Sequence, residues 1–380
     1  MSWLKKIYER ELLPMGLLMG TIIGAGFFSL PYVVSKSGAA LGFFYLLLGT
    51  VSYLVVHLMY ADVIVGTQTT HRFPGYANLY LGKSGRMLAI LASVFGSLLA
   101  MTIYLVLSAS FGRLIAPIAG GGAEISIFWL LGSLTLFLRL KGLTAVETII
   151  TGGIIAIIGV ISWLGIGNAH LPPLSEASLK TIGLPLSPAI FSLGGLSAIY
   201  LITEYVRRRG GSWQTSLKRV ITLGTVIPAI LYALFILGII GLSKEVSPDG
   251  VSGLVSQLHP LLLAAVGVLG LLTLWSSYVS VGFNLRDILG VDFNLPEWSR
   301  DLIVVGMPFG IYLAGFHDFL TLVSFAGGFL LALEGILAIL MWRQFRSQGG
   351  TSKILPNINP VILVIVMLTF AAAFAYEIFS

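Results

Sequence analysis

Eleven apolar stretches, each long enough to cross a bilayer, follow one another along this 380-residue chain. A transmembrane helix needs about 20 mostly apolar residues. In lipid the backbone must satisfy its own hydrogen bonds, so only helices and closed barrels span it. The length and continuity of these stretches predict an all-α polytopic membrane protein. The expected spans are 12–35, 39–65, 86–116, 124–140, 143–167, 185–206, 217–242, 255–282, 301–316, 319–342 and 358–378.

The composition agrees with a membrane location and indicates an orientation. Charged residues make up 10% of the chain, against about 25% in soluble domains, and the mean hydropathy is +0.96. Most of the 22 Lys and Arg residues fall in alternate loops. Because cytoplasmic loops carry the Lys and Arg excess, we expect a multi-pass cell-membrane protein with a cytoplasmic N-terminus and an external C-terminus. The absence of cysteine excludes disulfides and thiolate metal sites.

The first span is interrupted by glycine. Residues 20–31 read GTIIGAGFFSLP, with Gly20, Gly24 and Gly26 close together and Pro31 after them. Glycine costs about 0.8–1.0 kcal/mol relative to alanine inside a helix, so a continuous helix is not expected. At bilayer depth an unwound backbone persists only where it is buried in protein or lines a cavity. We therefore expect a broken helix whose free N–H and C=O groups form a binding site.

The sixth span repeats this interruption. Residues 188–204 read PAIFSLGGLSAIYLITE, in which the segment 191–195 breaks the apolar run and a helical pattern resumes at Leu196. Two interrupted helices, each opening a set of five, indicate inverted repeats with a site at their interface. The alternative is that both glycine clusters only allow close helix packing. The expected units are a cytoplasmic segment 1–11, repeat one at 12–167, repeat two at 185–342 and an eleventh helix at 358–380.

Motifs from both halves resemble one transporter superfamily. GTIIGAGFFSLPYVVSKSG resembles the first helix of the amino acid/polyamine/organocation superfamily, especially its amino acid/auxin permease branch and the prokaryotic aromatic amino acid permeases. FSLGGLSAIYLITE is similar to the sixth helix of that branch, and VSFAGGFLLALEGILAILMW to the tenth. The resemblance implies a LeuT-type fold of two inverted five-helix repeats. It also implies secondary active transport of amino acids by alternating access, without an organic cofactor.

The two breaks offer groups that match an amino acid zwitterion. A half-helix N-terminus carries free N–H donors and a partial positive charge. The resemblance implies that the second half of the first helix, which begins near Gly24, binds the substrate carboxylate. Carbonyls freed in the breaks would accept the ammonium group, and one face of the third span would contact the side chain under a Phe191 lid. The candidate substrate-binding residues are Thr21, Ile22, Gly24, Ala25, Gly26, Ala100, Met101, Tyr104, Phe191, Ser192 and Gly194.

The lack of a charged side chain near the breaks favours a neutral substrate, and the resemblance favours large apolar or aromatic amino acids.

In sodium-coupled relatives a hydroxyl pair in helix 8 joins helix 1 carbonyls in an oxygen cage. The matching groups here are Ser276, Ser277 and the carbonyls of Gly20 and Ile23. The alternative is that the serines bond their own helix. Some proton-coupled relatives place a lysine in helix 5, and residues 149–164 contain none.

Proton coupling through another ionisable residue is the alternative to sodium coupling. Intramembrane acids are functional candidates by default. Glu334 is the best of them because it lies 15 residues after Phe319, about 22 Å along a helix. The sequence therefore leaves sodium and proton coupling both open.

Acidic residues near the cytoplasmic ends of the spans are candidates for gates or structural pairs. Glu204 and Asp62 are expected to pair with basic residues such as Arg207. In LeuT-type folds the N-terminal segment clamps the end of helix 8 when the inner side is closed. The matching pair here is Lys5 with Asp287.

Two other functional classes compete with an ion-coupled symporter. A membrane enzyme has no support, because the five histidines are scattered and neither an HExxH motif nor paired carboxylates occur. An amino acid exchanger or sensor on the same fold stays open, since sensing and transport share a binding site. The expected partners are an amino acid, Na⁺ or H⁺ as coupling cation, and the lipid bilayer, with no nucleic acid.

Overall fold

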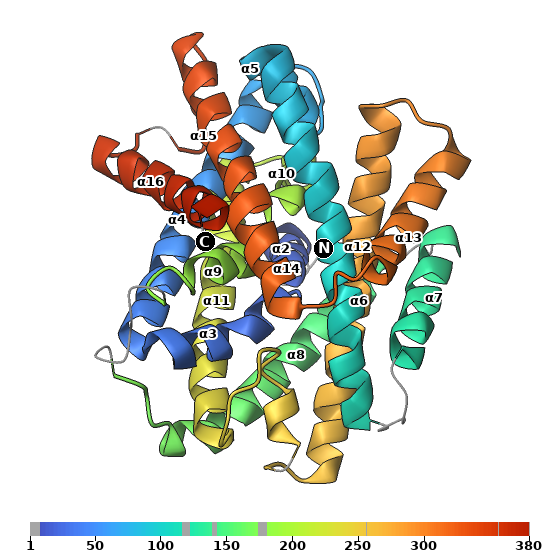
Figure 1. Cartoon of the computed structure of the whole chain (residues 1–380). Coiled ribbons are helices and arrows are strands. Elements are labelled where there is room, and N and C mark those ends of the chain that lie inside the picture. Colours follow the sequence, from blue (N-terminus) through green and yellow to red (C-terminus); the bar gives the residue numbers. More distant parts are fainter. Residues whose placement is uncertain are drawn as a thin grey trace.

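The computed structural model describes residues 8–115, 122–138, 143–173, 181–255, 257–355 and 357–379. The side chains of residues 138 and 143–149 lie outside this description. Within the described ranges all regular structure is helical, which confirms the predicted all-α class. Figure 1 shows short helices α2, α9 and α10 in the middle of the molecule, with longer helices around them.

The first half of the chain runs from η1 to η4. Its elements are η1 (Tyr8–Leu12), α2 (Leu13–Ile22), η2 (Gly26–Ser29), α3 (Leu30–Ser37), α4 (Ala39–Gly66), α5 (Phe73–Ile90), η3 (Leu91–Phe95), α6 (Gly96–Ile115), α7 (Ala123–Leu138), α8 (Leu143–Gly165) and η4 (Ile166–Asn168). The second half holds α9 (Leu186–Leu193), α10 (Leu196–Arg207), α11 (Trp213–Leu242), η6 (Ser252–Leu254), α12 (Pro260–Val291), α13 (Glu297–Leu313), α14 (Phe319–Phe325), η7 (Ala326–Leu331), α15 (Ala332–Ser347) and α16 (Pro360–Phe379).

These helices account for the predicted spans. Eight helices of the described chain are long and apolar enough to cross a membrane, and a bent pair, Tyr8–Ile22 with Gly26–Ser37, makes a ninth. α7 and α13 are shorter, with 16 and 17 residues, and overlap the fourth and ninth predicted spans. The chain is therefore a multi-pass membrane protein.

Both predicted interruptions are present. The two parts of the first span meet at an angle of 49°. Ile23, with φ −77° and ψ 74°, has the geometry of an inverse γ-turn, and the Gly24 amide donates to the Ile22 carbonyl at 2.8 Å. In the sixth span α9 ends at Leu193 and α10 begins at Leu196, where the sequence pattern resumes. Between them, Gly194 (ψ 120°) and Gly195 (φ −146°) are not helical.

The third span is longer and less regular than its apolar pattern predicts. It starts at Phe73, before the predicted start at residue 86. Gly82 kinks it, with φ 72°, a backbone conformation that L-residues rarely adopt. The π-helix η3 then lies within the span, and a second π-helix, η7, lies within the tenth. π-bulges occur frequently at functional sites, and η3 and η7 contact each other.

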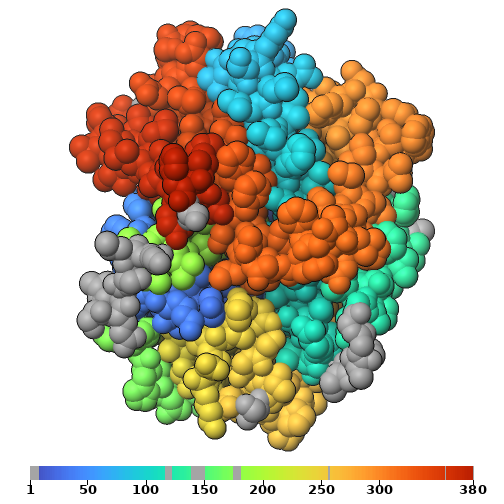
Figure 2. Space-filling model, viewed as in Figure 1, coloured from blue at the N-terminus to red at the C-terminus, as the bar shows by residue number. Residues whose placement is uncertain are grey.

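The broken helices pack against α4, α8, α11, α12 and η7. α11 contacts α2, α4, α8 and α10, so it acts as a scaffold beside both breaks. Figure 2 shows the near face of the molecule, formed largely by α5–α6 and by α13–α16. Residues 22–26 and 192–193 at the breaks are buried, so their unpaired backbone groups are screened from lipid.

Candidate functional site

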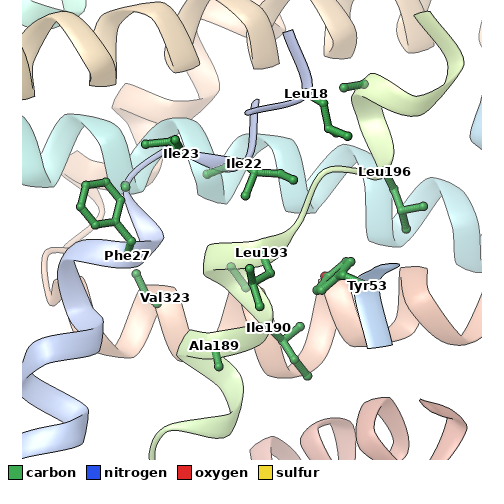
Figure 3. Packing of buried hydrophobic residues seen from close by; sticks show 14 of the residues in the cluster. Leu18, Ile22, Ile23, Phe27, Tyr53, Ala189, Ile190, Leu193, Leu196 and Val323 are labelled. Carbon is green, nitrogen blue, oxygen red and sulfur yellow. The ribbon is translucent and has the colours of Figure 1, made fainter. Parts of the chain in front are cut away.

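The two breaks pack against each other through glycine. A Cβ on Gly26 would lie 2.7 Å from the Ser192 Cα and 2.9 Å from its backbone nitrogen, and one on Gly195 would lie 2.8 Å from Ile22 Cγ1. Figure 3 shows the two breaks next to each other, with Ile22 of the first span between Leu193 and Leu196 of the sixth. Glycine at these positions is therefore required for the close approach of one backbone to the other.

Tyr232 of α11 joins the two breaks. Its buried hydroxyl lies 2.8 Å from the Ile22 carbonyl oxygen and 3.0 Å from the Ser192 carbonyl oxygen, and it donates to them. No sequence pattern distinguishes this residue, because most tyrosines in apolar helices only pack against their neighbours. The contact links the positions of two segments 170 residues apart.

The first break keeps two backbone donors unused. Among the described residues, the amides of Ala25 and Gly26 donate no hydrogen bond, and they precede the 3₁₀ turn Gly26–Ser29. Such amides, together with the partial positive charge of a helix start, bind anions. The Gly24 amide, which the sequence placed in this group, is instead used by the γ-turn to Ile22.

The hydroxyls in the breaks stabilise helix ends. Thr21 Oγ1 donates to the Leu17 carbonyl at 2.9 Å, and Ser192 Oγ donates to the Ala189 carbonyl at 2.9 Å. These bonds satisfy carbonyls of the preceding turn. The hydroxyl protons of both residues are therefore engaged within their own helices.

A cavity of about 90 Å³, the central cavity, lies where the breaks meet α6, α12 and α15. Met101 and Ser192 do not line it: Met101 is fully buried with its Cε beside Gly282, and Ser192 contributes backbone contacts to Gly26. The remaining nine predicted substrate-binding residues line it, namely Thr21, Ile22, Gly24, Ala25, Gly26, Ala100, Tyr104, Phe191 and Gly194.

A second cavity of about 210 Å³, the vestibule, shares a junction with the first. Its far end is the mouth, where Arg72 lies 2.9 Å from Asp287 and its guanidinium stacks over the Tyr200 ring at 4.2 Å. The residues lining both cavities are Thr21, Ser93, Leu196, Ser197, Val281, Asn284 and Glu334. The site is therefore open towards the mouth.

The opposite end of the site is closed by aromatic rings. Phe28 packs edge-on against Phe111 and Phe235, with ring centroids 4.8 and 5.7 Å apart, and Phe27 stacks on Tyr232 at 5.1 Å. All five rings are at most 2% exposed. We call Phe27, Phe28, Phe111 and Phe235 the aromatic seal. Within the described part of the chain, the two cavities therefore open towards the mouth and not through the seal.

Comparison with known proteins identifies the family. The family model described as "Tryptophan/tyrosine permease family" matches residues 11–375. The chain belongs to this family. It is therefore a permease and not an enzyme, as the sequence predicted. No curated protein matches the permease in sequence.

Solved structures confirm the LeuT-type fold. The permease superposes on the manganese transporter of Eremococcus coleocola in complex with an aromatic bis-isothiourea substituted compound, with TM-score 0.67 and 14% identity over 99% of this chain and 88% of that one. A histidine-to-alanine variant of the same transporter gives TM-score 0.65 and 15% identity, with the same coverage of both chains. At this identity the likeness concerns the fold alone.

The candidate sodium ligands of the permease lie around the first break. Ser276 and Ser277 are buried in α12, and the Ser277 Oγ faces the Tyr104 hydroxyl beside Gly24. A Cβ on Gly24 would lie 3.7 Å from this Oγ, so the hydroxyl faces the unwound turn that contains Ile23. Gly20, one turn earlier, faces the Thr151 hydroxyl of α8, which the sequence did not single out.

The acidic candidates of the permease take different positions. Glu334 lines both cavities, and Ser93 Oγ donates to it at 3.2 Å. Glu204 lies 3.5 Å from Arg207 at the end of α10, as expected for a structural pair. Asp287 pairs with Arg72, whereas its predicted partner Lys5 lies outside the described residues.

Asp62 does not pair with a basic side chain. The buried carboxylate accepts hydrogen bonds from the Trp342 ring nitrogen at 3.0 Å and from the backbone amides of Lys353 and Ile354 at 2.8 and 3.0 Å. The expectation of a pair such as Arg207 is wrong for this residue. Asp62 instead anchors the loop after α15 to α4. Among the described residues, no group of three or more His, Cys, Asp and Glu could hold a metal ion.

The loop between α11 and α12 covers the aromatic seal. Asp249 accepts hydrogen bonds from the amides of Val251 and Ser252 at 3.2 and 3.0 Å, and a Cβ on Gly250 would lie 2.5 Å from the Phe28 carbonyl oxygen. Burial acts to raise the pKa of Asp249, but hydrogen bonds from Ser110, Ser247 and Ser252 outweigh it and lower the pKa. Asp249 therefore holds this loop as a carboxylate.

Proposed function

We propose that the permease is an ion-coupled symporter that takes up aromatic amino acids, of the tryptophan and tyrosine class, by alternating access. The observation that carries this proposal is the central cavity at two facing helix breaks, in a chain of the tryptophan/tyrosine permease family. Discontinuous helices at such an interface are where secondary transporters bind their substrates.

The zwitterion fits the groups that the breaks leave available. The Ala25 and Gly26 amides bind the carboxylate, and the carbonyls of the breaks accept the ammonium group. The central cavity alone, at about 90 Å³, holds only a few water molecules. An aromatic side chain must therefore reach the junction with the vestibule. Binding from the mouth side requires no opening of the aromatic seal.

The cavities indicate a conformational state. The mouth lies beside the loops after α4 and α12, which belong to the set enriched in Lys and Arg. Cytoplasmic loops carry that excess, so the structure corresponds to an inward-facing state of a cell-membrane protein. In the outward-facing state the aromatic seal separates and the mouth closes. Arg72, Tyr200 and Asp287 form the inner gate of this proposal.

Two ion sites have specific support. The Ser277 hydroxyl beside the unwound turn favours a Na⁺ cage completed by Ser276 and the carbonyls of Gly20 and Ile23, since neutral oxygens suit a hard cation. Glu334 in the cavity wall favours proton coupling instead. Manganese, the cargo named for the structural neighbours, is not proposed, because backbone groups and hydroxyls dominate the central cavity and Glu334 is its one carboxylate.

The test is uptake of labelled L-tryptophan into proteoliposomes, under an inward sodium gradient and separately under an inward proton gradient. Accumulation above the equilibrium level under one gradient supports symport. A Ser277→Ala variant should abolish sodium-driven accumulation, or a Glu334→Gln variant proton-driven accumulation. Exchange without accumulation under either gradient would contradict symport and indicate an exchanger. Binding without any flux would indicate a sensor.

A further inference from the structure

Glu334 occupies the junction between the two cavities. The backbone that would bind the carboxylate, at Ala25 and Gly26, lines only the central cavity, whereas Glu334 lines both cavities. The aromatic seal closes the other direction. A substrate anchored at the first break can therefore extend its side chain only towards the junction.

The wall along this direction is lined by small residues. Ala92, Gly96 and Ala100 of η3 and α6 present small groups to the central cavity at successive turns. A Cβ on Gly96 would be in van der Waals contact, at 3.8 Å, with Leu330 and Leu331 of the facing η7. The ring of a substrate therefore passes over this small-residue surface on the side of the junction, where the two cavities meet. Beyond it the lining becomes polar, with Ser197 and Asn284 beside Glu334.

Local structure brings Ser93 and Glu334 together. Ser93 lies within the π-helix η3, and Glu334 follows the π-helix η7 by one turn. Ser93 Oγ donates to Glu334 Oε1 at 3.2 Å, which fixes the carboxyl group at the cavity wall. Holding a carboxylate away from bulk water costs free energy unless the carboxylate accepts further hydrogen bonds. A hydrogen-bond donor of a ligand at this position would lower that free-energy cost.

Aromatic amino acids differ in the donor that they offer at this point. The indole ring has an N–H group that only donates, the phenol ring has an O–H group, and the phenyl ring has no donor. We propose that Glu334, oriented by Ser93, accepts the ring N–H of tryptophan or the ring O–H of tyrosine and so selects both over phenylalanine. This inference rests on the proposed function, because it assumes that the zwitterion binds at the breaks.

The chain contains a matched control for this pair. Glu377 of α16 accepts a hydrogen bond from Ser187 Oγ at 3.2 Å, the same length as in the Ser93–Glu334 pair. Glu377 lines neither cavity. Replacing either glutamate removes an intramembrane carboxylate held by a serine, but only Glu334 faces the substrate path.

The experiment is displacement of labelled L-tryptophan from the purified full-length permease, at equilibrium and without an ion gradient. The competitors are L-tryptophan against 3-benzothienylalanine, in which sulfur replaces the ring N–H, and L-tyrosine against L-phenylalanine. A hydrogen bond to a charged acceptor predicts about 10- to 100-fold tighter binding of the donor-bearing member of each pair. In Glu334→Leu both ratios should fall to near one, with the affinity for phenylalanine little changed, while Glu377→Leu should keep both ratios.

Two further variants refine the test. Ser93→Ala frees the carboxyl group to move and should lower both ratios several-fold without abolishing them. Glu334→Gln keeps an acceptor of the same shape without the charge, so its ratios should lie between those of the wild type and Glu334→Leu. Glu334→Gln also tests the proposal if Glu334→Leu does not fold.

Several outcomes would overturn the inference. Affinity ratios near one in the wild type would show that the permease does not recognise a hydrogen-bond donor on the ring, and this measurement needs no variant. An equal loss of affinity for all four competitors in Glu334→Leu would show that the carboxylate binds the ammonium group or supports the fold. If the wild type binds none of these amino acids, the proposed function fails as well. If it binds them with ratios that ignore Glu334, only this inference fails.

Discussion

The two ends of the substrate path are closed by different kinds of contact. At one end four phenylalanine rings pack together at most 2% exposed, under a loop whose Gly250 touches the Phe28 carbonyl. At the other end Arg72 and Asp287 form one ion pair with side chains 21% and 56% exposed. Aromatic pairs contribute about 0.5–1.5 kcal/mol each beyond their burial, whereas exposed ion pairs contribute about 0.2–1 kcal/mol.

The difference between buried aromatic contacts and an exposed ion pair indicates which end of the path opens at a lower free-energy cost. The aromatic seal involves several buried contacts that must separate together, while the mouth already leads to a cavity of about 210 Å³. The structure therefore represents a state in which one end is firmly closed and the other is lightly gated. The broken helices lie between the two ends, so substitutions there should affect both.

Gly26→Ala is expected to have the largest effect. The added Cβ would meet the Ser192 backbone at 2.7–2.9 Å, and neither backbone can yield without separating the breaks. We expect tryptophan uptake to fall about 100-fold or more, measured in proteoliposomes with matched protein content. Gly159→Ala is the control, because nothing lies within 4 Å of its Cβ position. Wild-type uptake by Gly26→Ala would show that close contact of the breaks is not required.

Phe28→Ala should loosen the aromatic seal. Truncating a buried phenylalanine costs about 3–5 kcal/mol, and the cost falls on the state in which the seal is closed. Because the chain has no cysteine, labels can be attached to single cysteines introduced at Ile115 and Glu245, near the seal. The population with a longer label distance should rise at least tenfold. An unchanged distance distribution would mean that the rings do not close this end.

Tyr232→Phe should weaken the link between the two breaks. Without the hydroxyl, the buried Ser192 carbonyl loses its donor, whereas the Ile22 carbonyl keeps the Gly24 amide. An unsatisfied buried group costs about 1–3 kcal/mol. We expect a lower unfolding temperature in detergent and reduced uptake. Tyr45→Phe, on the half-buried outer side of α4, is the control. A loss of equal size in the control would remove the argument for a specific bridge.

Arg72→Ala should shift the inner gate modestly. The loss of one partly exposed pair changes an equilibrium by at most about fivefold. Labels at Thr69 and Val291 flank the mouth, and their distance should increase in the variant. In the wild type the same shift should appear at high salt, since salt screens exposed charges. The gate assignment fails if Arg72→Ala and Asp287→Ala both leave the distance distribution unchanged.

Acid should loosen the loop over the aromatic seal, and this effect should be the smallest. The pKa of Asp249 is lowered in the folded protein from its ordinary 3.8, so its stabilisation is present above about pH 4 and is lost as the pH falls through the lowered value. Amide hydrogen exchange in residues 247–253, corrected for intrinsic rates, should accelerate only below about pH 4. In Asp249→Asn the corrected exchange should be fast at every pH. Acceleration already between pH 7 and 5 would contradict the assignment.

The sequence predicted the structure best where glycine residues determine the backbone conformation. Glycine clusters predicted both breaks, and the pattern after Gly195 placed the restart of the helix at Leu196, where α10 begins. Helix 3 was placed too late because the segment 73–85 is amphipathic, and a search for apolar spans misses such a helix. Gly24 was expected to offer its amide to a ligand, but a γ-turn uses it.

Contacts between distant segments could not be predicted. Tyr232 contacts Ile22 and Ser192, 210 and 40 residues away, and Arg72 contacts Asp287, 215 residues away. Nothing in the local sequence of either residue distinguishes it from packing or loop residues. The same holds for Asp62, whose donors come from the loop after α15. Such pairings depend on the assembled fold and follow only from the three-dimensional structure.

Binding of the amino acid by both breaks together can be tested in a cryo-electron microscopy structure of the permease with saturating L-tryptophan. We expect the carboxylate within about 2.7–3.2 Å of the Ala25 and Gly26 amides, with the indole ring pointing to the junction at Glu334. Tryptophan bound away from both breaks, or with its ring directed at the aromatic seal, would contradict this expectation.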